Sequence, residues 1–315
     1  MRIVNMRDIE KTKPNQTQRT LGVAVVLLVL GAAVAYLASG TMTAPPTFDE
    51  NRALADAAYQ LSLGPRIFDS DAHRQTVEWI VSQTRAAGWQ VEIQEIPYAL
   101  LDENTAAASP IRNVVARRGK GQPWIILGAH YDSRLWADQD QNTNARRLPV
   151  PGANDGASGV AVLLELARAL PKKLDKQIWL VFFDAEDNGQ IPGWDWILGS
   201  RGFVEKLVGR PDAVVIVDMI GDADLNIYLE RNSNAALSTA IWQTAASLGY
   251  TQFIPQYKYN MLDDHTPFLQ AGIPAVDIID FDYPYWHTTA DTLDKLSAQS
   301  LDAVGETLLA WLTGD

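Results

Sequence analysis

Apolar runs of this 315-residue chain end in side chains that can do chemistry. One run ends at His130 and another is followed by Asp218. A third run, 178–183, leads directly into three carboxylates within four residues: Asp184, Glu186 and Asp187. Carboxylates at that spacing repel one another unless a cation or a shared proton offsets their charge. The pattern therefore favours a cation or an acid–base site.

Two further segments add metal-binding side chains. Asp155 lies in the small-residue turn 152–159, and His287 follows Trp286 directly. The chain contains no cysteine, which excludes disulfides, thiolate nucleophiles and thiolate metal sites, so that any metal must be bound by His, Asp or Glu. Oxygen and imidazole ligands suit zinc, and a catalytic zinc keeps one position open for water or substrate. A neighbouring carboxylate that is not a ligand can then move a proton.

The scaffold that must position these side chains follows from the order of apolar and amphipathic segments. Strand-like segments occur at 89–96, 124–127, 178–183, 214–217 and 275–279. Helical segments occur at 49–63, 70–87, 157–170, 199–207, 235–248 and 297–312. This alternation predicts an α/β fold of three layers, with a central, mostly parallel twisted sheet between helices. In such folds functional groups gather beyond the carboxyl ends of the strands.

The N-terminal segment predicts a membrane anchor. Residues 1–20 contain five basic and two acidic side chains, and no charged residue occurs from Thr20 through Phe48. The apolar stretch 21–40 has the roughly 20 residues that a helix needs to cross a bilayer. We expect a cytoplasmic tail (1–20), a transmembrane signal-anchor (21–40), a linker (41–48) and an extracytoplasmic catalytic domain (49–315). Cleavage at the small residues 38–40 is the alternative, and would give a secreted or periplasmic protein.

The charge balance excludes one class of partner. The chain has 26 Lys and Arg against 38 Asp and Glu, a net charge of −12. Without the first 20 residues the net charge is about −15, since these residues are mostly basic. An acidic domain of this kind repels nucleic-acid phosphates, so we expect no nucleic-acid partner.

As a set, the segments around these residues resemble the co-catalytic zinc aminopeptidase family, and more closely its glutaminyl-peptide cyclotransferase branch. The resemblance covers roughly residues 50–312. Its motifs are Gly128-Ala-His-Tyr-Asp-Ser133, Gly152 to Gly159, Phe182-Phe-Asp-Ala-Glu-Asp187, Leu198-Gly-Ser-Arg201, Val217-Asp-Met-Ile-Gly221, Asp263-Asp-His-Thr-Pro-Phe268 and Trp286-His-Thr288. It implies a zinc exopeptidase-like fold.

The resemblance implies two alternative metal sites. In the cyclotransferases one zinc ion is held by the positions of Asp155, Asp187 and His287. In the aminopeptidases two zinc ions share Asp155; one is also held by His130 and Asp187, and the other by Asp218 and His287. We expect one zinc ion, with a second at His130 and Asp218 as the alternative. Asp187 departs from the glutamate of most relatives and is one methylene shorter.

For a cyclotransferase, the resemblance implies a peptide substrate that begins with glutamine and a pyroglutamyl product, with ammonia released. Glu186 is expected to move the proton, and Asp218 and Asp263 to support that transfer. The predicted substrate-binding residues are Trp286, Trp194 and Tyr283.

Two other functions stay open. A di-zinc aminopeptidase would use Glu186 to activate water and would remove the first residue of a peptide. A binding ectodomain would retain the fold without catalysis, although no expected position is lost. We expect His265 to be structural or to support the site, and His73, within a predicted helix, to be incidental.

Overall fold

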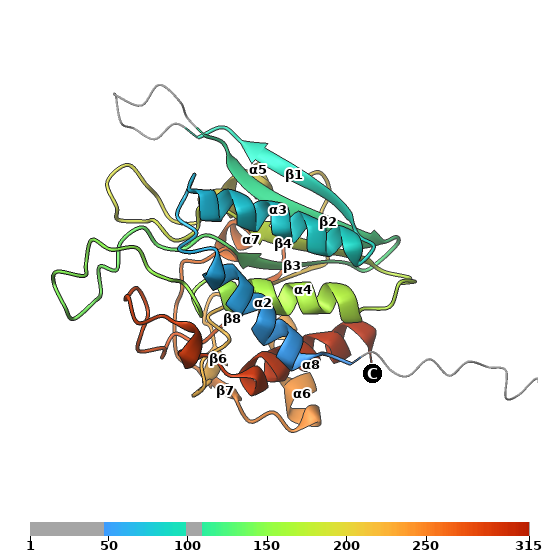
Figure 1. Cartoon of the computed structure of the whole chain (residues 1–315). Coiled ribbons are helices and arrows are strands. Elements are labelled where there is room, and N and C mark those ends of the chain that lie inside the picture. Colours follow the sequence, from blue (N-terminus) through green and yellow to red (C-terminus); the bar gives the residue numbers. More distant parts are fainter. Residues whose placement is uncertain (1–46, 99–108, 315) are drawn as a thin grey trace, which may run out of the picture. The chain divides into compact units, whose positions relative to one another are not determined.

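The central sheet of the computed structural model has six strands in the order β1-β2-β4-β3-β5-β8 (Figure 1). The structure describes residues 47–98 and 109–314. The strands are β1 (Gln90–Ile96), β2 (Ile111–Gly119), β3 (Trp124–His130), β4 (Gln177–Phe183), β5 (Ala213–Asp218) and β8 (Ala275–Ile279). Strands β4, β3, β5 and β8 run parallel, whereas β1 and β2 pair antiparallel. The predicted mostly parallel sheet is thus confirmed, with an antiparallel edge.

Both faces of the sheet are buried, as its apolar runs predict. On β3, Ile125 and Leu127 belong to one hydrophobic core, while Trp124 and Ile126 belong to another. Successive side chains of a strand point to opposite faces, so a strand that is apolar at every position must be covered twice. The three-layer prediction is therefore correct.

Helices form the two outer layers and contact different cores. The larger core includes side chains from α2 (Glu50–Ser62), α3 (Asp71–Ala86), α4 (Ala157–Ala169) and α8 (Ala298–Thr313). The smaller core includes side chains from α5 (Leu198–Glu205) and α7 (Thr266–Gln270). Helix α6 (Ala235–Leu248) packs on α8 and on β7 (Phe253–Tyr257). Strand β7 pairs with β6 (Ile227–Leu229) in a second, two-stranded sheet. A short 3-10 helix, η1, spans Leu293–Lys295.

Helix starts follow local sequence signals. Ser70 accepts a hydrogen bond from the His73 amide at the start of α3, as an N-cap serine does. Asp49 caps α2 in the same way through the Arg52 amide. The long strand β2 is not among the predicted strands, because Arg117 and Arg118 interrupt its apolar pattern. Strands β6 and β7 and helix α7 are also absent from the prediction. Strand β6 has only three residues, and β7 has one buried residue, so neither contains the apolar run that predicts a buried strand.

The predicted signal-anchor, residues 21–40, lies outside the described residues. Within 47–98 and 109–314, no helix combines the length and the apolar character that a bilayer crossing requires. Residues 47–98 and 109–314 belong to one compact unit with its own hydrophobic cores.

Candidate metal and active site

The predicted site residues meet at the edge of the sheet where the parallel strands end, which we call the catalytic edge. His130 is the last residue of β3, and Asp218 is the last residue of β5. Glu186 and Asp187 follow β4 within four residues. Because β4, β3 and β5 are parallel neighbours, their carboxyl ends lie together, on the left in Figure 1.

One trio of ligands combines Asp155, Asp187 and His287. Their ligand atoms lie within 4.8 Å of one another, and all three side chains are buried. His287 Nε2 lies 2.8 Å from Asp187 Oδ1 and 3.6 Å from Asp155 Oδ2. The structure thus brings together the three residues expected to hold a single zinc ion.

A second trio combines His130, Asp155 and Asp218. His130 Nε2 lies 3.1 Å from Asp155 Oδ1 and 3.2 Å from Asp218 Oδ1. The two trios share Asp155, and His130 and Asp218 are the pair expected for a second ion. The pairing implied for the aminopeptidases, His130 with Asp187 and Asp218 with His287, differs from these trios. His130 lies with Asp218 rather than Asp187, and Asp187 lies with His287.

The donor set fits a metal such as zinc. Two ligand residues, Asp155 and Asp187, each keep a buried carboxylate oxygen, Oδ2, without a hydrogen-bond partner among the described residues. Buried polar atoms without partners carry a large free-energy cost, which a bound cation removes. Carboxylate oxygens and imidazole nitrogens are both zinc ligands, and a catalytic zinc takes three protein ligands. Both trios can therefore hold a metal ion.

Asp132 orients both trios, and it is absent from the predicted site. Its two carboxylate oxygens accept hydrogen bonds from the amides of Glu186 (3.1 Å) and Asp187 (3.2 Å). Its Oδ1 also lies 3.4 Å from His130 Nδ1, a contact that favours the tautomer with Nε2 free for a metal. The spacing from His130 to Asp132 is a signal in the sequence, because residues two apart on an extended strand share a face.

Asp291 holds the turn that contains Asp155. Its carboxylate accepts hydrogen bonds from the amides of Asn154 (2.8 Å) and Asp155 (3.2 Å), and from the Tyr283 hydroxyl (2.7 Å). Burial, and then the charge of Asp155, raise the pKa of Asp291 to about 7. Gly156 completes the turn at a φ of +96°, where a Cβ would lie 2.6 Å from the Asp132 carbonyl oxygen.

The pKa values of His287 and Glu186 are both raised, but for different reasons. Burial acts to lower the pKa of His287, but Asp187, Asp138 and Asp155 outweigh it and raise the pKa to about 9. Burial also dominates at Glu186, whose pKa is raised well above the usual glutamate range, with His130 opposing and Asp187 adding to the shift. In the metal-free protein, protons on His287 and Glu186 therefore offset part of the negative charge of the site.

Strained backbone occurs at three site positions. Ala185, Met219 and His287 have φ values of +52°, +46° and +55°, in the left-handed region that residues other than glycine rarely adopt. Ala185 is the second residue after β4, and Met219 is the first residue after β5. Each turns the chain next to a carboxylate of the site. Such strain persists only where surrounding contacts enforce it, and it gathers at functional sites.

Asp263 lies in a separate buried cluster with His265 and Asp277. Their ligand atoms lie within 4.8 Å of one another, and His265 Nε2 also lies 3.4 Å from Glu230 Oε2. The charge of Asp263 adds to the raised pKa of both Glu186 and Asp218; burial is the main cause at each, and the pKa of Asp218 reaches about 7. Asp263 thus acts on the site through its charge, and His265 belongs to its surroundings.

The tryptophans near the site differ in whether they contact His287. The Trp286 ring stacks on His287 at a centroid distance of 3.7 Å, and the Trp196 ring stacks near it at 6.0 Å. Trp194 instead packs edge-on against Phe68 at 5.0 Å. Trp196 rather than Trp194 therefore lies beside the metal trio.

Tyr283 does not match its predicted place in a substrate-facing wall. It is only 3% exposed, and its hydroxyl is used by Asp291. His73 is also not incidental: it is fully buried, and its Nε2 lies 2.7 Å from Asp184 Oδ1, which links α3 to the end of β4.

Known proteins share this fold. The chain is similar to the solved glutaminyl cyclase of Porphyromonas gingivalis, with 33% identity and a TM-score of 0.78 over 85% of this chain and 99% of that chain. It is also similar to a solved Zn-dependent exopeptidase from Parabacteroides distasonis, with 28% identity and a TM-score of 0.78 over 86% of this chain and 100% of that one. Glutaminyl-peptide cyclotransferase of Bos taurus is 28% identical over 226 residues, which are 58% of this chain and 60% of that protein. The model of peptidase family M28 matches residues 113–312, and the chain belongs to this family.

Proposed function

We propose that this protein is a zinc-dependent glutaminyl-peptide cyclotransferase, which converts an N-terminal glutamine into pyroglutamate and releases ammonia. The observation that carries the proposal is the metal trio of Asp155, Asp187 and His287 beside the buried Glu186 and under the Trp286 ring. The similarity to the P. gingivalis glutaminyl cyclase over 99% of that solved chain supports it.

Zinc held by Asp155, Asp187 and His287 would polarise the carbonyl of the substrate's glutamine side chain. The substrate's own α-amine then attacks the side-chain carbon, so that a new C–N bond forms and the bond to the amide nitrogen breaks. Both reacting groups belong to one residue, so the protein needs no nucleophile of its own and acts mainly by enforcing their proximity.

Glu186 takes the proton from the attacking amine and delivers it to the leaving ammonia. A carboxyl with a raised pKa suits this exchange, because a group that titrates closer to neutral pH can both accept and donate a proton. Asp218 and Asp263 add negative charge around Glu186. Trp286 packs against the stem of the substrate's glutamine.

A di-zinc aminopeptidase is the second candidate, and one observation favours it. The trio of His130, Asp155 and Asp218 is complete, so the ligand residues for a second ion are all present. In that reaction Glu186 would activate water for attack on the first peptide bond.

Metal content and product analysis separate the two candidates. We would purify the protein, count its zinc ions by mass spectrometry, and incubate it with a Gln-initiated peptide and a Leu-initiated peptide in parallel. About one zinc ion, ammonia release and a loss of about 17 Da from the first peptide alone would establish the cyclotransferase. Nearly two zinc ions and free leucine from the second peptide would establish the aminopeptidase.

We further propose that residues 21–40 anchor the protein in a membrane, with the catalytic domain on the extracytoplasmic side. The uncharged stretch and its basic N-terminal flank support this topology. Protease protection of the full chain in sealed vesicles tests it.

A further inference from the structure

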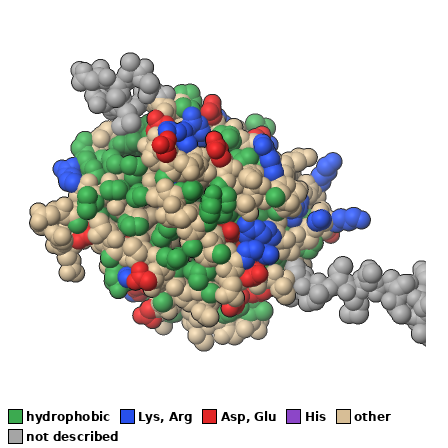
Figure 2. All heavy atoms as spheres, viewed as in Figure 1, with side chains coloured by type: hydrophobic (Ala, Val, Ile, Leu, Met, Phe, Trp, Pro, Cys, Tyr) green, Lys and Arg blue, Asp and Glu red, His purple; other side chains and the backbone are tan. Residues whose placement is uncertain are grey.

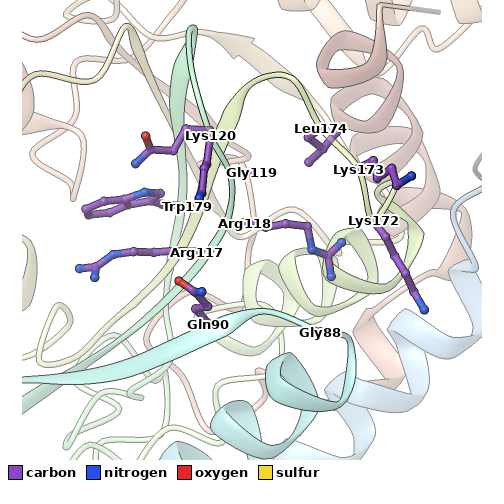
Figure 3. A pocket seen from close by; sticks show the side chains of 11 residues that line it. Gly88, Gln90, Arg117, Arg118, Gly119, Lys120, Lys172, Lys173, Leu174 and Trp179 are labelled. Atoms are coloured by element: carbon purple, nitrogen blue, oxygen red, sulfur yellow. The ribbon is translucent and has the colours of Figure 1, made fainter.

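A basic hollow lies at the other edge of the sheet, where the parallel strands begin. It has a volume of about 550 Å³, and Figure 3 shows five basic side chains around it, from β2, the β2–β3 turn and the loop after α4. They are Arg117, Arg118, Lys120, Lys172 and Lys173. Among the described residues, the lining includes no acidic side chain, although the chain has a net charge of −12. We call this surface the basic edge.

The two arginines build the walls of the hollow. Arg118 donates hydrogen bonds to the carbonyls of Leu170 and Ala87 and lies over the Trp89 ring at 4.2 Å. Arg117 pairs with Glu92 and lies 4.1 Å from the centroid of the Trp179 ring.

The three lysines supply the charge that is free to attract a partner. Lys120, Lys172 and Lys173 are exposed. Among residues 47–98 and 109–314, none of these three lysines forms an ion pair with an acidic side chain. In Figure 2, Lys and Arg side chains gather toward the right, the side on which Figure 1 places the end of α4. An acidic domain can approach an anionic surface only through such a face.

The described chain begins close to the basic edge. The Phe48 amide donates to Glu306 Oε1 on α8 at 2.7 Å, and Lys176, from the same loop as Lys172, donates to the Leu312 carbonyl on α8 at 2.5 Å. Six residues of helix separate Glu306 from Leu312, a rise of about 9 Å. The predicted anchor ends at residue 40, and the seven residues to Thr47 reach at most about 25 Å.

We propose that the basic edge docks on the anionic phosphate headgroups of a lipid bilayer. Strand β3 is seven residues long, so the catalytic edge lies about 20 Å farther from that surface, at the other end of the strand. Docking then turns the metal trios away from the bilayer and toward peptide N-termini in solution. This inference does not depend on which reaction the trios catalyse.

Vesicle binding tests the proposal on the domain from residue 47 onward. This domain has its own hydrophobic cores, and 85% of the whole chain matches 99% of the solved P. gingivalis chain. Co-sedimentation would compare vesicles of pure phosphatidylcholine with vesicles that contain phosphatidylglycerol. The test variant is Lys120→Glu/Lys172→Glu/Lys173→Glu.

The control reverses three exposed charges on other elements: Arg74→Glu/Lys206→Glu/Arg231→Glu. Unlike the three lysines, Arg74 is ion-paired, and Lys206 and Arg231 donate to backbone carbonyls. Both variants must retain the circular dichroism spectrum and thermal midpoint of the parent domain. We expect binding to phosphatidylglycerol vesicles to fall about 100-fold in the test variant and at most about threefold in the control, since each lysine near an anionic surface adds a comparable share of the affinity.

Three outcomes would overturn the proposal. The parent domain could show no preference for anionic vesicles, or the control variant could lose binding as strongly as the test variant. The third outcome is saturable binding of inorganic pyrophosphate without vesicle binding. It would assign the hollow to a soluble phosphate ligand.

Discussion

The two edges of the central sheet concentrate charge in opposite ways. At the catalytic edge, carboxylates and imidazoles are buried, and His130 is only 2% exposed. At the basic edge, Lys120, Lys172 and Lys173 are exposed to solvent. Buried charges must be paired, protonated or bound to a metal, whereas exposed charges are screened by water and act on their surroundings at longer range. One sheet thereby supports a chemical site at one edge and an electrostatic surface at the other.

The difference shows in the pKa values of the catalytic edge. The pKa of Asp218 is raised to about 7, because burial and the charges of Asp263 and Asp155 outweigh the opposing effect of His130. Chemistry is expected only where burial changes the protonation of the side chains. Substitutions at the two edges should therefore affect different measurements.

The largest effect is expected for Glu186→Gln. Removing the group that moves the proton should lower kcat for a Gln-initiated peptide about 10²- to 10⁴-fold, with zinc content and fold unchanged. Steady-state ammonia release measures kcat, and Glu205→Gln, on the exposed end of α5, is the matched control. Intact turnover in Glu186→Gln would remove Glu186 from the mechanism.

The pH dependence of zinc binding comes next in size. His287 is protonated below about pH 9 in the metal-free protein, and zinc binds only the neutral imidazole. Zinc binding must then release at least one proton, so the apparent affinity should fall about tenfold for each pH unit below 9, or about 100-fold from pH 8 to pH 6. Competition with a chromogenic chelator measures this, and a flat profile would contradict the charge state assigned to His287.

A smaller effect is expected for Trp286→Ala. Loss of the ring that stacks on His287 should raise KM for a Gln-initiated peptide about tenfold and change kcat by less than about threefold. Trp286→Phe retains an aromatic face and should recover most of the affinity. If kcat fell while KM stayed constant, Trp286 would position His287 rather than bind substrate.

The smallest effect is expected for Tyr283→Phe. The hydroxyl donates to Asp291, so its loss should lower the free energy of unfolding by about 1 kcal/mol and leave KM within about twofold. Urea unfolding and steady-state kinetics measure the two quantities. A raised KM at unchanged stability would return Tyr283 to the substrate-binding wall.

Much of the fold was predictable because local patterns encode it. Strand β8 and helix α6 have the predicted bounds, 275–279 and 235–248. Strand β2 was not predictable from its pattern, since Arg117 and Arg118 are stabilised by Trp179, Trp89 and backbone carbonyls that are distant in the sequence.

The sequence alone determined which side chains stand at the catalytic edge. His130 and Asp218 end apolar runs, and a buried strand exposes functional groups only where it stops. The absence of cysteine likewise restricted the ligands to His, Asp and Glu. These inferences need only the local order of residues along the chain.

Only the tertiary structure decided which ligands meet. His130 pairs with Asp218 because β3 lies next to β5, while Asp187 lies four residues beyond β4 and reaches His287, from the loop after β8. Lateral strand order and the turn at Ala185 set these distances, and neither is encoded in the periodicity of a single strand. The basic edge has the same origin, because its lysines come from segments about 50 residues apart that meet only when β2 pairs with β4.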